Sequence, residues 1–126
     1  MIHLDTNLLI AASDKGDPHA PSFQRLIGLR RSLGTSACAW AEFHSRPIEV
    51  QTERLIRQML QSGILPFDEA TAALAGELFF RTGSKRRTRL DSMIAATAIL
   101  AGAELATANR EDFEPFVPHG LKLLVW

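Results

Sequence analysis

Apolar and polar positions along the chain fall into short blocks that switch between strand-like and helix-like spacing. The first apolar block, Met1–Leu4, has strand character and leads directly into a carboxylate, Asp5. The hydroxyl of Thr6 and the amide of Asn7 follow, and a second apolar block continues to Ala12. This pattern predicts a strand, a sharp turn, and a short helix from Thr6 to Ala12.

The rest of the chain repeats this alternation. Helices are expected from an N-cap at Ser22 to near Gly34, and over Ala37–Ser45, Val50–Gln61, Glu69–Phe80 and Met93–Ala101. Strands are expected over Leu33–Ser36, Ile64–Phe67, Leu105–Ala108 and Leu121–Trp126, with a turn and a helical turn over Asn109–Phe116. Strands alternating with helices favour a three-layer α/β/α sandwich with a mostly parallel sheet. The length of 126 residues favours one domain over residues 1–126.

For three of these segments, the sequence also predicts where they lie relative to the core. Pro66 suits a strand at the edge of the sheet, because proline has no N–H for a central ladder. Met93–Ala101 is apolar on nearly every side, which is typical of a buried helix. In Val50–Gln61, one apolar stripe is made of Leu55, Ile56, Met59 and Leu60, and the core is favoured over a partner surface as its place.

Composition excludes several classes of protein. Fourteen Lys and Arg balance fourteen Asp and Glu, so overall charge attracts neither nucleic acid nor membrane. The single cysteine, Cys38, can form neither an intrachain disulfide nor a thiolate zinc cage by itself. No apolar run approaches the roughly 18–20 residues of a membrane helix, and the first residues lack the pattern of a signal peptide. We therefore expect a cytoplasmic protein with no membrane contact.

Four carboxylates stand out by position. Asp5 follows the first strand, and Glu42 lies in an otherwise apolar helical stretch. Asp91 stands at the start of the most buried helix, and Asp112 follows the strand Leu105–Ala108. Ligand sites in parallel sheets lie beyond the carboxyl ends of the strands. Three of the four acids stand at strand ends or helix starts, so they are expected to face one edge.

Each acid also has a simpler interpretation. Asp5 and Asp91 could be helix caps, Glu42 could face water, and Asp112 could be a solvated loop acid. Taken together, however, acids gathered at one edge would repel one another unless a cation lay between them. Ligand sets made only of oxygen favour Mg²⁺ or Mn²⁺, so the sequence predicts a site for one of these ions.

A strongly basic segment, 84–89, directly precedes Asp91 and contains Arg86, Arg87 and Arg89. A charge run of this kind is usually a solvated turn. Beside an acidic metal site, it is also what a polyanionic phosphate backbone requires, which favours a nucleic-acid substrate.

The acids lie in segments with a recognisable order. These are Ile2–Asn7 (IHLDTN), Trp40–Phe43 (WAEF), Arg89–Ala98 (RLDSMIAATA) and Leu105–Phe113 (LATANREDF). Together they resemble the motifs of PIN-domain ribonucleases, and most of all those of the VapC toxins of VapBC toxin–antitoxin pairs. The resemblance spans nearly the whole chain.

The resemblance implies Mg²⁺-dependent cleavage of RNA to 5′-phosphate and 3′-hydroxyl products, a VapB-like antitoxin partner, and a homodimer. Asp5, Glu42 and Asp91 correspond to the three most regular acids of the family. The fourth acid corresponds either to Asp112, which we favour, or to the position of Asn109. Other residues are expected to contact the substrate: Thr6, which corresponds to a hydroxyl near the metal, Asn109, Arg86, Arg87 and Arg89.

Other functions remain open at this point. A PIN-like domain without catalysis could serve as a binding or assembly module. A phosphoryl-transfer domain with an aspartyl nucleophile usually has a second acid two residues later, where this chain has Asn7. The helical stripes of Phe23–Arg31 and Val50–Gln61 could belong to the core or to a surface that binds a partner.

Overall fold

The computed structural model describes every residue from Met1 to Trp126, in three layers with a five-stranded sheet at the centre. The strands are β1 (Ile2–Leu4), β2 (Leu33–Ser36), β3 (Gly63–Leu65), β4 (Glu104–Ala106) and β5 (Lys122–Leu123). The α-helices are α1 (Thr6–Ser13), α2 (Ala20–Ile27), α3 (Ala37–Phe43), α4 (Val50–Met59), α5 (Glu69–Arg81), α6 (Arg89–Leu100) and α7 (Arg110–Phe113). Two short 3-10 helices are η1 (Arg86–Thr88) and η2 (Glu114–His119).

All neighbouring strands are parallel, in the order β3-β2-β1-β4-β5. The chain leaves β1 for β2 on one side, and returns much later to form β4 on the other side. The order of strands therefore reverses at β1, and the crevice between the carboxyl ends of β1 and β4 is the usual place for a ligand site. The register pairs Leu4 with Ala106, so Asp5 and Thr107 leave the sheet side by side.

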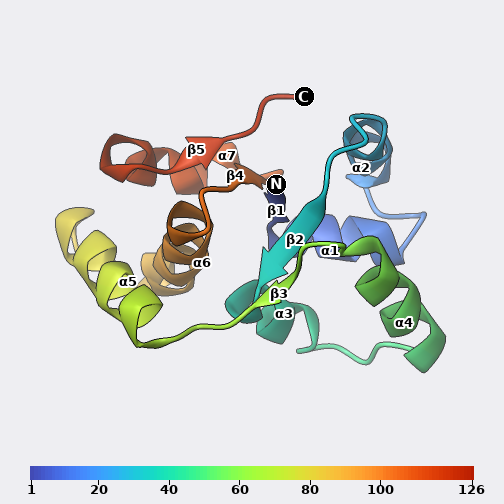
Figure 1. Cartoon of the computed structure of the whole chain (residues 1–126), viewed down its shortest axis with the longest axis horizontal. Helices are drawn as coiled ribbons and strands as arrows, with labels where there is room; N and C mark the ends of the chain where they lie inside the picture. The colour runs from blue at the N-terminus through green and yellow to red at the C-terminus, as the bar shows by residue number, and fades with distance from the viewer.

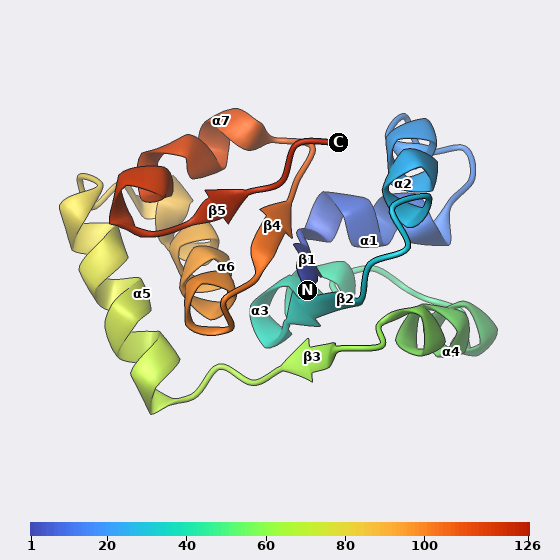
Figure 2. The same cartoon turned by 45° about the horizontal axis from the view of Figure 1, so that its top comes forward.

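The helices cover both faces of the sheet. Figure 1 shows α5 and α6 on one side of the sheet and α1, α2 and α4 on the other, and Figure 2 shows the same division from a second direction. The helix α3 contacts both α1 and α6, so it lies where the two layers meet. These observations confirm the α/β/α sandwich, with a sheet that is entirely parallel.

Local sequence explains where the helices near the carboxyl edge begin. The side chain of Asp5 caps α1 by accepting a hydrogen bond from the backbone N–H of Thr6. Ser36 caps α3 by accepting from the N–H of Ala39 at 3.0 Å. The helix α6 is apolar on nearly every side and is buried over most of its length, as its sequence predicts.

Four expectations about the elements were wrong. Ser22 lies inside α2, which begins at Ala20 because Pro21 suits a first helical turn, where no N–H partner is needed. That helix ends at Ile27 rather than near Gly34. The closing strand covers only Lys122–Leu123, and Leu55 is 61% exposed because α4 turns Ile56 toward the core instead.

The central strand also buries a histidine. His3 is 1% exposed, and neither of its ring nitrogens has a hydrogen-bond partner. Burial, together with the nearby N-terminal charge, lowers the pKa of His3 to about 4, so the ring is neutral. None of the helices has the length and apolar character needed to span a bilayer.

Candidate metal centre at the carboxyl edge of the sheet

Asp5 lies at the centre of the site and is 5% exposed. One carboxylate oxygen accepts from the backbone N–H of Thr6 at 2.8 Å. The other accepts from the Asn7 amide at 3.1 Å and from the Thr107 hydroxyl at 2.8 Å. All three donors are neutral. They hold the carboxylate in one orientation and leave its negative charge uncompensated.

Asn7 and Thr107 connect the ends of β1 and β4 around this carboxylate. The Asn7 side chain accepts from the N–H of Ala108 at 3.2 Å, and the Thr107 hydroxyl accepts from the N–H of Asn109 at 3.0 Å. Thr107 was not among the expected site residues. The sequence does place Thr107 near the carboxyl end of an expected strand, and in the structure it directly follows β4, just as Asp5 follows β1. Recognising that the two residues lie side by side, however, requires the register between two strands that are distant in the sequence.

The other three acids come from three helices. Asp91 lies in the first turn of α6 and does not cap it, since Thr88 holds the cap position. Glu42 is exposed near the end of α3, and Asp112 is exposed in α7.

The acids influence one another electrostatically. Burial, together with the charges of Asp5, Asp112 and Glu42, raises the pKa of Asp91 to about 7. Burial also raises the pKa of Asp5, against the hydrogen bonds from Thr107 and Thr6, and Glu42 and Asp112 add to the increase. The charges of Glu42 and Asp112 therefore reach both Asp5 and Asp91.

A hollow of about 280 Å³ lies on one side of this group and mixes acids with cations. Asp91 and Asp112 line it together with Lys85, Arg87 and Thr88. Of the three arginines expected to hold phosphate, only Arg87 lines this hollow. Lys85 was not among the expected residues, although it belongs to the same basic segment.

The other two arginines of the basic segment lie elsewhere. The guanidinium of Arg89 lies over the ring of Phe79, 4.3 Å from its centroid, and lines a separate apolar hollow. Arg86 is exposed in η1. The side chain of Asn109 is also exposed, while its backbone contributes to the network around Asp5.

Comparison with known proteins shows the family to which the chain belongs. A family model described as the PIN domain matches residues 2–115. The chain belongs to the PIN domain family. No curated protein sequence matches it significantly.

Solved structures of PIN-domain size match the chain over nearly its full length. One is VapBC2 from Rickettsia felis bound to a DNA fragment from its promoter, with a TM-score of 0.70 and 22% identity, covering 100% of this chain and 99% of that one. Another is FitAcB from Neisseria gonorrhoeae, with a TM-score of 0.70 and 24% identity, covering 99% and 97%. At this level of identity, the two matches show the fold.

A third match is closer in sequence. It is a toxin–antitoxin complex from Klebsiella pneumoniae, 26% identical with a TM-score of 0.68, covering 90% of this chain and 91% of that one.

The acids at the carboxyl edge offer oxygen donors, which are the ligands that Mg²⁺ and Mn²⁺ prefer. None of these four acids forms an ion pair, because the four ion pairs of the molecule use other residues. The hydroxyl of Thr6 is buried next to Asp5 and has no hydrogen-bond partner. Both observations fit a bound cation with oxygen ligands. The side chains do not already form a closed cage, since no three His, Cys, Asp or Glu side chains are close enough to hold an ion.

Proposed function

We propose that this chain is a cytoplasmic, Mg²⁺- or Mn²⁺-dependent endoribonuclease, the VapC-type toxin of a type II toxin–antitoxin pair, with a single PIN-like domain over residues 1–126. One observation supports the proposal most strongly. Four carboxylates from separate elements lie near enough to the switch point of a parallel sheet to raise the pKa of Asp5 or Asp91 or both, and none of the four forms an ion pair. An uncompensated acidic group of this kind costs folding free energy, which a functional cation site explains.

In this mechanism, Asp5 and Asp91 would be the main residues that hold a divalent ion, and Glu42 and Asp112 would complete the set. When bound, the ion would supply the positive charge needed to activate an attacking water and to neutralise the phosphoryl oxygens. Thr107, Asn7 and the N–H of Thr6 keep the Asp5 carboxylate in position, so it does not need to reorganise when substrate arrives.

In this proposal, the substrate binds in the hollow beside Asp91. Lys85 and Arg87 line the same 280 Å³ space as Asp91 and Asp112, so a phosphate attracted by the cations lies next to the acids. Cations of this kind bind the backbone of RNA without reading its bases. Arg86 and Arg89 contribute to the positive field from outside this hollow.

We propose a VapB-like antitoxin as the protein partner. The Klebsiella pneumoniae match is a toxin–antitoxin complex, and it is the match with the highest identity described above. The helix α4 supports a partner surface, because Val50 is 71% exposed and Leu55 is 61% exposed. A homodimer belongs to the same proposal. Phe80 on α5 is 78% exposed and offers a separate apolar contact.

The decisive experiment replaces Asp5 with Asn. Asp5→Asn keeps the size of the side chain, so we expect the fold to remain and RNA cleavage in Mg²⁺ to be lost. Sequencing of RNA ends after induction of the wild type and of Asp5→Asn measures cleavage, and circular dichroism measures folding. A folded variant that still cuts RNA would disprove the assignment of Asp5.

One observation favours the alternative of a binding module without catalysis, namely the lack of a closed group of three ligands. Titration of the protein with Mg²⁺ and Mn²⁺ by calorimetry separates the two functions. We expect binding in the wild type and much weaker binding in Asp91→Asn. A wild type that binds neither ion would support the binding module.

A further inference from the structure

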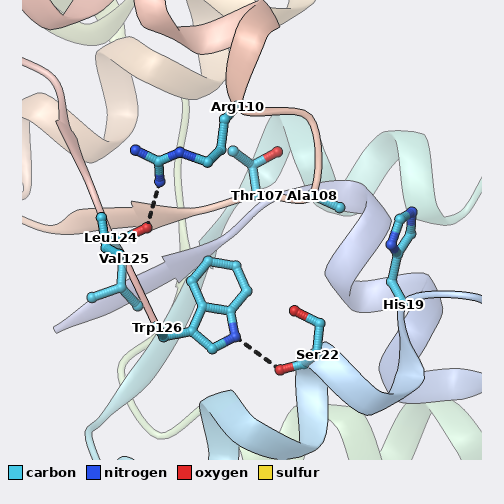
Figure 3. Close-up of a pocket in the computed structure, with 8 residues that line it drawn as sticks. All are labelled: His19, Ser22, Thr107, Ala108, Arg110, Leu124, Val125 and Trp126. Carbon is cyan, nitrogen blue, oxygen red and sulfur yellow. Dashed lines mark hydrogen bonds between the residues drawn. The ribbon is translucent and has the colours of Figure 1, made fainter.

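A second hollow lies beside the acidic site, and nothing in the proposed mechanism uses it. It has a volume of about 280 Å³ and is shown in Figure 3. Its lining residues come from three segments: Thr107, Ala108 and Arg110 after β4, Trp126 after β5, and His19 just before α2. The segment 107–112 therefore borders both hollows, since Asp112 lines the acidic one.

The chemistry of this second hollow differs from that of the first. No carboxylate side chain lines it, whereas it contains an indole, a guanidinium and an imidazole. Arg110 forms no ion pair in the molecule. A planar aromatic ring next to a planar cation is the surface on which proteins stack the unpaired bases of single-stranded RNA.

Both planar groups are held in place by backbone carbonyls. The indole N–H of Trp126 donates to the carbonyl of Ser22 at 2.8 Å, and the guanidinium of Arg110 donates to the carbonyl of Leu124 at 2.7 Å. Figure 3 shows both hydrogen bonds, and it shows Arg110, Trp126 and His19 arranged around the same space. Each bond uses only one N–H of its group. Trp126 is partly buried against the hydrophobic core, and the rest of its indole, like the guanidinium of Arg110, lines the hollow.

Thr107 connects this hollow to the acidic site. It lines the hollow, and its hydroxyl donates to the Asp5 carboxylate at 2.8 Å. A ligand in the hollow therefore touches the residue that positions the central acid.

We propose that this hollow is a nucleobase subsite, in which Trp126 stacks on one unpaired base of the RNA and Arg110 hydrogen-bonds its edge. This proposal rests on the proposed ribonuclease function and adds to it a residue that selects single-stranded RNA at one position beside the cut. A phosphate alone fits the hollow less well, because Ala108 and Val125 make part of its lining apolar. A base has a flat apolar face together with polar edges.

The test combines two variants of Trp126 with abasic substitutions in a short single-stranded RNA. Binding is measured in EDTA, where the wild type cannot cut. Trp126→Leu keeps an apolar side chain without a ring to stack, and we expect about tenfold weaker binding. Trp126→Phe keeps a ring but loses the N–H donor to Ser22, and we expect it to bind within a few-fold of the wild type.

A double-mutant cycle identifies the base. An abasic nucleotide at one position beside the cleavage site should weaken binding to the wild type about tenfold, and should cost Trp126→Leu almost nothing more. Equal losses in both proteins at every position would overturn the subsite. So would RNA binding that Trp126→Leu leaves unchanged while it weakens binding of a protein partner, because the hollow would then serve that partner.

Fluorescence provides a measurement that does not depend on the folding of Trp126→Leu. The chain has two tryptophans, so Trp40→Phe leaves Trp126 as the only indole. We expect RNA to quench this indole, and an RNA with the abasic nucleotide at the identified position to quench it much less. An unquenched indole in a protein that cuts RNA would refute the subsite alone. A wild type that neither binds nor cuts any RNA would instead refute the proposed function.

Discussion

The edge of the sheet at the amino ends of the strands (the amino edge) and the edge at their carboxyl ends (the carboxyl edge) differ in how their charges are paired. At the amino edge, Arg31 and Glu104 form an ion pair at 2.6 Å beside the starts of β2 and β4. The hydroxyls of Ser32 and Ser62 also bond to each other there. At the carboxyl edge, four acids lie together without a single ion pair, and the pKa of Asp91 rises to about 7 as a result of burial and of their repulsion.

This difference separates a structural surface from a candidate functional one. Paired charges at the amino edge satisfy each other and require nothing else. Unpaired acids at the carboxyl edge cost folding free energy until a cation binds to them. We therefore predict that carboxylates of the carboxyl edge matter for RNA cleavage and that the carboxylate of the amino edge does not.

The largest expected effect is on RNA cleavage by matched variants of the two edges. Asp91→Asn removes a proposed ligand and should reduce kcat by more than the roughly 10–100-fold that loss of an outer-shell partner costs. Glu104→Gln makes the same chemical change at the amino edge and should leave kcat within about twofold. Single-turnover cleavage of a labelled RNA measures both. Equal effects would remove the distinction between the edges.

The next effect is on stability, and it should change sign with metal. The raised pKa of Asp91 means that ionising this group opposes folding as the pH rises from about 4 to about 7. Asp91→Asn should therefore stabilise the metal-free protein at pH 8, by about 1 kcal/mol once solvent screening of this partly exposed group is included. The gain should disappear near pH 4. Thermal denaturation with EDTA at the two pH values measures it.

Metal should reverse this order at pH 8. Mg²⁺ at 100 times its Kd should stabilise the wild type by about 2.7 kcal/mol and should stabilise Asp91→Asn much less. Glu104→Gln serves as the control, since it should respond to Mg²⁺ like the wild type. A wild type whose melting temperature ignores Mg²⁺ would contradict the metal site.

A smaller effect concerns the salt dependence of RNA binding. Arg87 lines the hollow beside Asp91, whereas Arg31 lies at the opposite edge. Arg87→Gln should reduce the slope of log Kd against log salt by about 1, because one phosphate contact is lost. Arg31→Gln should leave the slope unchanged. Fluorescence anisotropy at several salt concentrations measures both slopes, and equal slopes would remove Arg87 from the substrate path.

The smallest effect is on the amino edge itself. The ion pair between Arg31 and Glu104 is partly exposed, with side-chain exposures of 39% and 33%. Its coupling energy should therefore be only about 0.2–1 kcal/mol. A double-mutant cycle with Arg31→Gln and Glu104→Gln, followed by urea denaturation, measures it. A coupling of several kcal/mol would show that the amino edge carries more than an ordinary surface pair.

Much of the fold followed from periodicity because local patterns determine it. The helix α6 could be recognised from its continuous apolar character, and β2 from its boundaries at a turn and a cap. Asp5 could be proposed as a site residue because it directly follows a strand. The exposure of Leu55 could not be predicted in this way. The apolar stripe shows which residues share a helical face, but it does not show how α4 is turned against α1.

The parts of the site that were missed depend on distant contacts. The hydroxyl of Thr107 reaches Asp5 across 102 positions of the chain, and the indole of Trp126 reaches Ser22 across 104. The sequence predicted a strand up to Trp126, whereas β5 ends at Leu123 and the chain continues to α2. Such contacts require the register and layer order, which no local pattern contains.

The edge strands of the sheet have a consequence for how other chains can associate with it. At one edge, β3 has three residues and is followed at once by Pro66, which has no N–H. At the other, β5 has only two residues and exposes Lys122. Short edges with a proline or a lysine resist the addition of a foreign strand and the aggregation that follows from it. A second protein chain must therefore recognise this molecule through its side chains and helices, and not by extending its sheet.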